Sequence, residues 1–276
     1  MEEHSEHEST IEATWRTYLT TGYHTKESRY RRLFGLLPAN PRCRFCNAPF
    51  DGLGATLVRL VFDKRPSKLN PRLCNVCDNF ASRFQGGAEI ELSMLFADIR
   101  GSTNLAEGMS LSDFSRLINR FYNAATKVLI RTDALIDKII GDQVTGLYVP
   151  GFAGPEHAHR AIEAAQEILR VTGHDSPDGP WIPLGAAVHT GTAFVGAVGS
   201  KDGTTDITVL GDAANTAARL SSNARQGEIL ISEAACAAAG LQLQNLEKRI
   251  LELKGKSEPV SVYVMTDYSH LASKES

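Results

Sequence analysis

Long apolar runs are missing from this 276-residue sequence. A membrane-spanning helix needs about 20 consecutive apolar residues, and the nearest candidate, 184–199, is interrupted by polar residues and glycine between His189 and Thr192. The first residues are acidic and polar, which is unlike the apolar core of a secretory signal peptide. The composition, 42% hydrophobic and 22% charged residues, is typical of a globular protein. These features predict a cytoplasmic protein without a membrane partner.

Cysteine is also scarce, but four of the five cysteines form two Cys-x-x-Cys pairs, Cys43 with Cys46 and Cys74 with Cys77. Paired thiolates in tight turns are how a chain wraps a tetrahedral metal ion, and two disulfides are disfavoured in the expected compartment. The pattern favours one structural Zn²⁺ in a module similar to a zinc ribbon. An iron–sulfur cluster stays open as an alternative, because it also takes four cysteines. The fifth, Cys236, lies in an alanine-rich run and is expected to be a small buried apolar residue.

Net charge is only −3, but it is unevenly distributed. Residues 1–25 hold five glutamates and one arginine, whereas residues 26–83 hold twelve Lys plus Arg and four Asp plus Glu, a balance of 12 − 4 = +8. A basic segment therefore precedes an acidic one, and this asymmetry suggests separate roles.

Hydrophobic periodicity and punctuation predict the N-terminal organisation. Residues 1–12 are expected to be a solvated acidic tail, and 11–37 are compatible with helix. A short strand at 56–62, a basic loop at 63–71 and a helix through 80–84 are expected within the cysteine-rich segment. Gly86-Gly87 is predicted to break the chain. The expected domains are residues 1–37, the four-cysteine module 38–85 and a third domain, 88–268.

The rest of the chain alternates between strand-like and helical patterns. An amphipathic helix is predicted at 113–132, and a hairpin with its turn at Thr190-Gly191 is predicted from 181–189 and 193–198. The other predicted strands are 90–97, 135–140, 144–149, 205–210, 228–231, 241–253 and 260–264, and the other helices are 155–171, 212–222 and a short one after 231.

Two apolar runs each deliver a carboxylate. Asp98 follows the strand-like run 92–97, and Asp142 lies in the turn Gly141-Asp142 between two such runs. Either aspartate alone is most simply a turn former or a helix cap. Side by side, they could hold two Mg²⁺ ions, with the backbone carbonyl of Ile99 completing one coordination sphere. Two such metal ions would activate a hydroxyl and stabilise the in-line displacement of a phosphate leaving group.

A third motif, residues 206–220, places Asn215 and Arg219 four positions apart, on one face of a predicted helix. With all three motifs in this order, the chain resembles the catalytic domain of class III nucleotidyl cyclases, the adenylate/guanylate cyclase family, over about residues 90–266. The resemblance implies an α+β fold with a ferredoxin-like βαββαβ core, and the order of predicted elements suits it. It also implies Mg²⁺ or Mn²⁺ on the aspartates.

The same resemblance assigns the remaining roles. Asn215 would fix a ribose oxygen, and Arg219 would neutralise charge at the transferred phosphorus centre. Lys254 matches the family's terminal-phosphate lysine, and Lys256 is the alternative. Ser102 stands where relatives often carry an aromatic residue, which is expected to alter packing near the site.

Lys138 and Thr208 match the two positions of the family that recognise the base. Adenine presents an acceptor at N1 and a donor at N6, which a lysine donor and a threonine hydroxyl fit. Guanine would favour a carboxylate at the lysine position. Many family members carry aspartate where this chain has Thr208, so the chain is placed in the threonine-bearing subset, with ATP as the favoured substrate.

The sequence thus predicts an adenylate cyclase that converts ATP into 3′,5′-cyclic AMP and pyrophosphate for intracellular signalling. The resemblance implies a head-to-tail homodimer with composite sites. Guanylate cyclase or mixed specificity is the alternative among enzymes. From another class, the alternative is an inert cyclase-like scaffold whose basic cysteine segment binds nucleic acid or protein. The presence of all the residues expected of an active cyclase argues against an inert scaffold. A basic zinc module often only stabilises the fold, which argues against nucleic-acid binding.

Overall fold

The structure of the protein is a computed structural model that describes residues 2–22, 25–37, 41–200, 205–266 and 268. The chain forms two compact units, and strands β1 (Gly86–Ile99) and β4 (Leu184–Gly199) have residues in both. The first unit comprises Met1–Glu91, Val149–Pro155 and Thr192–Gly211, and the second comprises Leu92–Tyr148, Glu156–Gly191 and Asp212–Ser276.

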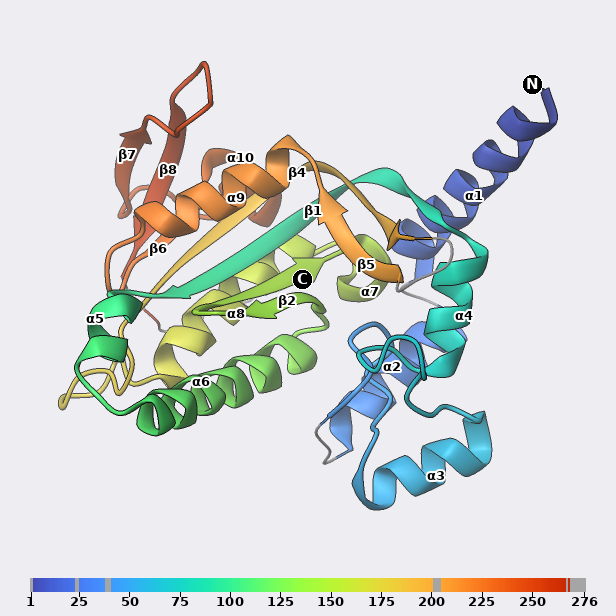
Figure 1. Ribbon diagram of the computed structural model, residues 1–276. Coiled ribbons are helices and arrows are strands. Elements are labelled where there is room, and N and C mark those ends of the chain that lie inside the picture. Colours follow the sequence, from blue (N-terminus) through green and yellow to red (C-terminus); the bar gives the residue numbers. More distant parts are fainter. Residues whose placement is uncertain (1, 23–24, 38–40, 201–204, 267, 269–276) are drawn as a thin grey trace. The chain divides into compact units, whose positions relative to one another are not determined.

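The first unit is mainly helical (Figure 1). An aromatic cluster fills its core. Trp15 is fully buried, its indole Nε1 donates to the carbonyl of Phe84 at 2.8 Å, and its ring meets that of Phe80 at 5.0 Å. Tyr18 stacks on Phe45 at 5.4 Å. Burial of such large apolar surfaces stabilises the packing of the helices α1 (Glu2–Thr21), α2 (Lys26–Leu36), α3 (Gly52–Phe62), α4 (Asn75–Arg83) and α7 (Pro150–Ala153).

Two expectations for the helical part of this unit are wrong. The acidic N-terminus is helical from Glu2 rather than an unstructured tail. The predicted strand 56–62 is part of helix α3, because Asp51 caps its first turn and Asp63, in the left-handed conformation, ends it. These caps outweigh the β-branched residues between them. The helix buries Val58 and exposes a stripe of leucines on its outer side.

Gly86-Gly87 also differs from the expectation, because it lies inside strand β1 and does not break the chain. Here β1 runs close to the end of β4. A Cβ atom on Gly87 would lie 2.4 Å from the carbonyl oxygen of Val195, and one on Gly196 would lie 2.2 Å from that of Gly86. The glycines are therefore needed for close backbone approach. The domain limits proposed from the sequence stay a prediction.

The second unit contains the expected α+β core. Its elements run β1, α6 (Leu111–Arg131), β2 (Leu135–Ile140), β3 (Gln143–Tyr148), α8 (His157–Val171) and β4, which is the βαββαβ order. The strand order β2-β3-β1-β4 continues as β6-β8-β7. Helices α6 and α8 pack against each other and against β2 and β3 (Figure 1). The remaining elements are α5 (Ser102–Glu107), α9 (Asp212–Asn223), β6 (Ile229–Ser232), α10 (Glu233–Ala239), β7 (Glu247–Leu251) and β8 (Val260–Met265).

Local sequence explains most of these elements. Ser110 caps α6 by accepting from the backbone N–H of Asp113 at 3.1 Å, and this amphipathic helix buries Phe121 and Ala125. Cys236 is buried on α10, as predicted. No helix in the described ranges is long and apolar enough to cross a membrane.

The predicted hairpin with a turn at Thr190-Gly191 is wrong, since β4 is one continuous strand. Within the second unit, the hydroxyl of Thr190 is buried and hydrogen-bonds that of Ser93 on β1 at 2.6 Å. A Cβ atom on Gly191 would lie 3.1 Å from Cβ of Ala213, so this glycine makes room for α9. Thr190 and Gly191 therefore serve packing within a strand, although such residue types are also typical of turns.

Candidate functional site

Asp98 lies at the end of β1, where the backbone pairs it with Gln143. Its side chain is 16% exposed, and Oδ2 accepts a hydrogen bond from the guanidinium of Arg100. Oδ1 is buried without a hydrogen-bond partner among the described residues. Burial raises the pKa of Asp98, the nearby charge of Asp142 adds to this, and Arg100 opposes it. A second positive charge would therefore be well accommodated at Oδ1.

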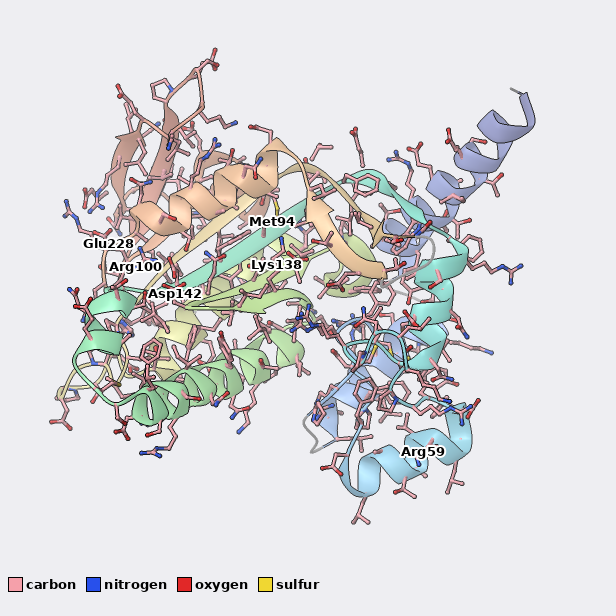
Figure 2. All side chains as sticks on the ribbon, viewed as in Figure 1. Arg59, Met94, Arg100, Lys138, Asp142 and Glu228 are labelled. Carbon is pink, nitrogen blue, oxygen red and sulfur yellow. The ribbon has the colours of Figure 1, made fainter. Side chains whose placement is uncertain are left out.

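Asp142 lies in the tight turn between β2 and β3, where Gly141 adopts a left-handed φ of 64°. The carbonyl of Asp142 accepts from the backbone N–H of Ile99 at 2.9 Å, which brings the turn to the end of β1. Its carboxylate accepts from the hydroxyl of Ser102 at 2.5 Å. The structure thus brings Asp98, Ile99 and Asp142 together, and Figure 2 shows Asp142 and Arg100 at one end of the sheet.

The donor set at this end of the sheet fits a hard divalent cation. Such ions take carboxylate and carbonyl oxygens, and the Asp98 carboxylate offers a buried oxygen that nothing in the described chain satisfies. Asp98, Ile99 and Asp142 are the residues that would hold the metal.

Sequence reasoning missed Arg100 and the contact of Ser102. Arg100 also donates to the carbonyls of Ser222 and Ala224, at 3.2 and 3.4 Å. Arg100 lies just beyond the end of β1, so no strand periodicity indicated its contact with Asp98. For Ser102 only altered packing was expected, whereas its hydroxyl orients Asp142.

Lys138 lies on β2 with its side chain 52% exposed, and its Nζ is 3.6 Å from Oδ2 of Asp137. The side chain of Asp137 is almost fully buried. The β2–β3 register shifts between Ile136 and Lys138, so Asp137 sits at a bulge. No pattern in the sequence predicted this bulge. The buried carboxylate thus lies beside the exposed ammonium group of Lys138.

Helix α9 carries Asn215 and Arg219, as predicted, with Asn215 exposed and Arg219 half-buried. A Cβ atom on Gly255 would lie 3.3 Å from Nη2 of Arg219, so the segment that contains Lys254 runs close to this guanidinium. Lys254 is exposed, whereas Lys256 forms an ion pair with Asp212 at the start of α9. Of the two lysines, Lys254 is therefore the one available to a phosphate.

Thr208 lies on β5 (Thr205–Leu210), within the first unit. Its hydroxyl is buried and has no hydrogen-bond partner among the described residues. A buried hydroxyl without a partner is costly, so a hydrogen bond to a ligand would be favourable here.

The four cysteines converge within the first unit. The Sγ atoms of Cys43, Cys46, Cys74 and Cys77 all lie within 4.8 Å of one another. Those of Cys46 and Cys74 are 3.7 Å apart, and sulfurs bonded tetrahedrally to Zn²⁺ at about 2.3 Å would be about 3.8 Å apart.

The surroundings of these thiols are also suited to a metal. Asn47 takes the positive φ of 61° that the tight turn after the first pair requires, and the backbone N–H of Cys74 donates to Cys43 Sγ at 3.2 Å. Lys64 Nζ lies 3.6 Å from Cys46 Sγ and offsets part of the thiolate charge. The cluster fits a metal ion with four thiolate ligands.

Known proteins resemble about two thirds of the chain in sequence and in fold. The family model of the adenylate and guanylate cyclase catalytic domain matches residues 87–267. An adenylate cyclase from Anabaena cylindrica is 31% identical over 183 residues, which are 62% of this chain and 36% of that protein. The crystal structure of the adenylyl cyclase CyaB from P. aeruginosa has a TM-score of 0.56 at 27% identity and covers 66% of this chain and 97% of that one. A guanylyl cyclase crystal structure has a TM-score of 0.59 at 25% identity, with 65% and 93% covered.

Proposed function

The chain belongs to the adenylate and guanylate cyclase catalytic domain family, and from this premise we propose that it is an adenylate cyclase, which converts ATP into 3′,5′-cyclic AMP and pyrophosphate. The observation that carries the choice of ATP is the pair Lys138 and Thr208. The exposed lysine can donate to N1 of adenine, and the unpartnered threonine hydroxyl can accept from N6. A guanine base, with its N–H at N1, would meet a donor where it needs an acceptor.

The reaction joins the ribose 3′-oxygen to the α-phosphorus and breaks the bond from that phosphorus to the bridging oxygen of pyrophosphate. The 3′-hydroxyl proton passes to water or to the substrate. Two Mg²⁺ or Mn²⁺ ions, when bound at Asp98, Ile99 and Asp142, supply Lewis acidity to the hydroxyl and charge neutralisation to the triphosphate.

The other residues orient the substrate and stabilise charge. Asn215 holds a ribose oxygen and so aligns the 3′-hydroxyl with the phosphorus. Arg219, one helical turn later and half-buried against the Gly255 segment, neutralises the charge that develops on the phosphoryl oxygens. Lys254, exposed in the same segment, binds the terminal phosphate.

Guanylate cyclase is the competing activity, since solved guanylyl cyclases share the fold. The test is incubation of the full chain with equal concentrations of ATP and GTP and Mn²⁺, followed by chromatography of the products. Mostly cyclic AMP is expected, and predominant cyclic GMP would overturn the assignment of the base-reading residues. Asp142→Ala serves as the inactive control.

A further inference from the structure

Asn70 links strand β5, which carries Thr208, to the four-cysteine segment, residues 41–85. The Asn70 side chain is buried, and its Nδ2 donates to the carbonyl of Thr205, the first residue of β5, at 2.9 Å. Its Oδ1 accepts from the backbone N–H of Arg72 at 3.1 Å. Both ends of the amide are thus in use, one within its own loop and the other on β5. All of these residues belong to the first unit.

Two weaker contacts support this bond. Gln85 Nε2 lies 3.5 Å from the hydroxyl of Thr205. Arg72 forms an ion pair with Asp206 at 3.5 Å, but both side chains are well exposed, and exposed pairs contribute little to stability. The buried hydrogen bond from Asn70 is therefore the main link.

The loop around Asn70, residues 67–73, is itself held by the four-cysteine segment. The backbone N–H of Ser67 donates to the carbonyl of Leu73 at 2.9 Å and closes the loop. The hydroxyl of Ser67 donates to the buried Asp78 of α4 at 2.5 Å. Cys74 follows directly. The position of Asn70 thus depends on the segment that the cysteines organise.

Strand β5 lies off the main path of the sheet, and the bond from Asn70 holds its first residue in place. Among the strands that the structure describes, it pairs with β4, and the residue opposite Thr208 is Gly196, which offers no side chain. Thr205 is buried, whereas Thr208 lies on the opposite face of the strand. A slip of one residue would exchange these faces and turn the Thr208 hydroxyl away from its present position.

We propose that Asn70 is a positioning residue for nucleotide selection, which fixes the register of β5, and with it Thr208, through the carbonyl of Thr205. The four-cysteine segment then takes part in recognition of the base, in addition to stabilising the fold. This inference rests on the proposed function, since it takes Thr208 as a base-reading group.

The sharpest test is Asn70→Asp in the full chain. This change keeps the Oδ1 acceptor for Arg72 but removes the donor to Thr205. Hydrogen exchange of the peptide 205–210 is expected to become faster. The ratio of kcat/KM for ATP over that for GTP is expected to fall about threefold to tenfold, as for loss of one neutral hydrogen bond, mainly through a higher KM for ATP.

Asn75→Asp is the matched control. Asn75 also bridges two backbone groups, accepting from the N–H of Arg65 at 2.9 Å and donating to the carbonyl of Asp63 at 2.9 Å. Both of these partners lie within the four-cysteine segment, so this variant should alter neither the β5 exchange nor the selectivity. In a Thr208→Ala background, Asn70→Asp should cause no further loss of selectivity, because the group that it positions is gone.

Each outcome is decisive. Unchanged exchange of 205–210 in Asn70→Asp, or an equal effect of Asn75→Asp, overturns the positioning role. Faster exchange with unchanged selectivity, in a wild-type chain that does prefer ATP, overturns the link to base recognition. A wild-type chain that does not discriminate ATP from GTP contradicts the proposed function instead, and the exchange data still decide whether Asn70 positions β5.

Discussion

At the scale of single residues, Arg100 is the charged group that contacts Asp98, the proposed metal ligand, in this structure. It contacts Oδ2 of Asp98 and also two backbone carbonyls, those of Ser222 and Ala224. A divalent cation on Asp98 would compete with this guanidinium for the same carboxylate. If a cation displaced Arg100 from Asp98, the hydrogen bonds to these two carbonyls would still hold the guanidinium in place.

Arg100→Gln is therefore expected to tighten Mn²⁺ binding several-fold, because a like charge beside the cation site is removed. Calorimetric titration of the chain with Mn²⁺ would measure this. Arg116→Gln is the control, since Arg116 pairs with the exposed Asp113 on α6. Equal or weaker binding in Arg100→Gln would show that the guanidinium does not compete with the metal.

Lys138→Glu is expected to lower kcat/KM for ATP by about tenfold or more, the effect of losing one hydrogen bond from a charged donor. The new carboxylate would also stand beside the buried Asp137. Steady-state kinetics with ATP would measure the loss, while Mn²⁺ affinity should change little. Lys127→Glu, at an exposed position of α6, controls for the change in net charge. If the Lys138→Glu variant still prefers ATP, Lys138 does not take part in base recognition.

At the scale of elements, the four-cysteine cluster and the outer strand β7 are both held by polar links. The cluster has little secondary structure between its two pairs apart from α3, so its geometry depends on the cysteines and the hydrogen bonds around them. Within the described part of the chain, strand β7 pairs with β8, and its side chains are all exposed or half-buried. Arg249 on β7 makes a bidentate contact with Glu228, at 2.9 and 2.8 Å, just before β6.

We propose that the cluster binds one Zn²⁺, and protein purified without added metal should contain about one zinc per chain by elemental analysis, as four thiolate ligands imply. Cys43→Ser and Cys74→Ser should lose the metal, whereas Cys236→Ser, outside the cluster, should keep it. A brown chain with visible absorption would indicate an iron–sulfur cluster instead.

Glu228→Gln is expected to lower the free energy of unfolding by about 2 kcal/mol at pH 7, the scale of hydrogen bonds to a charged group. Burial alone would raise the pKa of Glu228, but hydrogen bonds from Arg249 and from the backbone of Arg225 lower it. A lowered pKa in the folded state gives stability that is present above the unfolded value, about 4.3, and is lost as pH falls through the folded value.

The difference in stability between wild type and Glu228→Gln should therefore shrink from pH 7 to below pH 4, as measured by urea unfolding. Glu258→Gln, at an exposed position, is the control and should have little effect at either pH. A difference that does not change with pH would exclude the carboxylate charge as its cause.

At the scale of the whole molecule, we propose that the working form is a head-to-tail homodimer with two composite sites. The metal aspartates of each site would come from one subunit, and Lys138, Thr208, Asn215 and Arg219 from the other. A twofold arrangement of one chain that carries both sets builds two equivalent sites.

Asp142→Ala alone should be nearly inactive, and Asn215→Ala alone should be impaired, because each change affects both sites. Mixing the two variants should restore activity above either parent, since half of the sites in a heterodimer are intact. Cyclic AMP formation after mixing measures this, and differently tagged chains report subunit exchange. Confirmed exchange without recovery of activity would contradict composite sites, as would an active chain that is monomeric at all concentrations.

The strand ends and helices of the site were accessible from sequence, because local patterns encode them. Apolar runs that stop at Asp98 and Asp142, and the four-residue spacing of Asn215 and Arg219, needed no knowledge of distant contacts. The elements at 56–62 and around Thr190-Gly191 were mispredicted because their local signals are ambiguous. The caps of α3 and the packing of Thr190 on Ser93 decide them.

The sequence by itself determined the βαββαβ order and the four-cysteine pairs, since these follow from the types and spacing of residues, and its three motifs carried the resemblance to the family. Only the tertiary structure decided which polar groups meet. The contact of Arg100 with Asp98, the bulge that buries Asp137, and the bond from Asn70 to Thr205 join residues through backbone geometry. A hydrogen bond requires its donor and acceptor within about 3 Å, and for the Asn70–Thr205 bond, which links residues 135 positions apart, only the folded chain sets that distance.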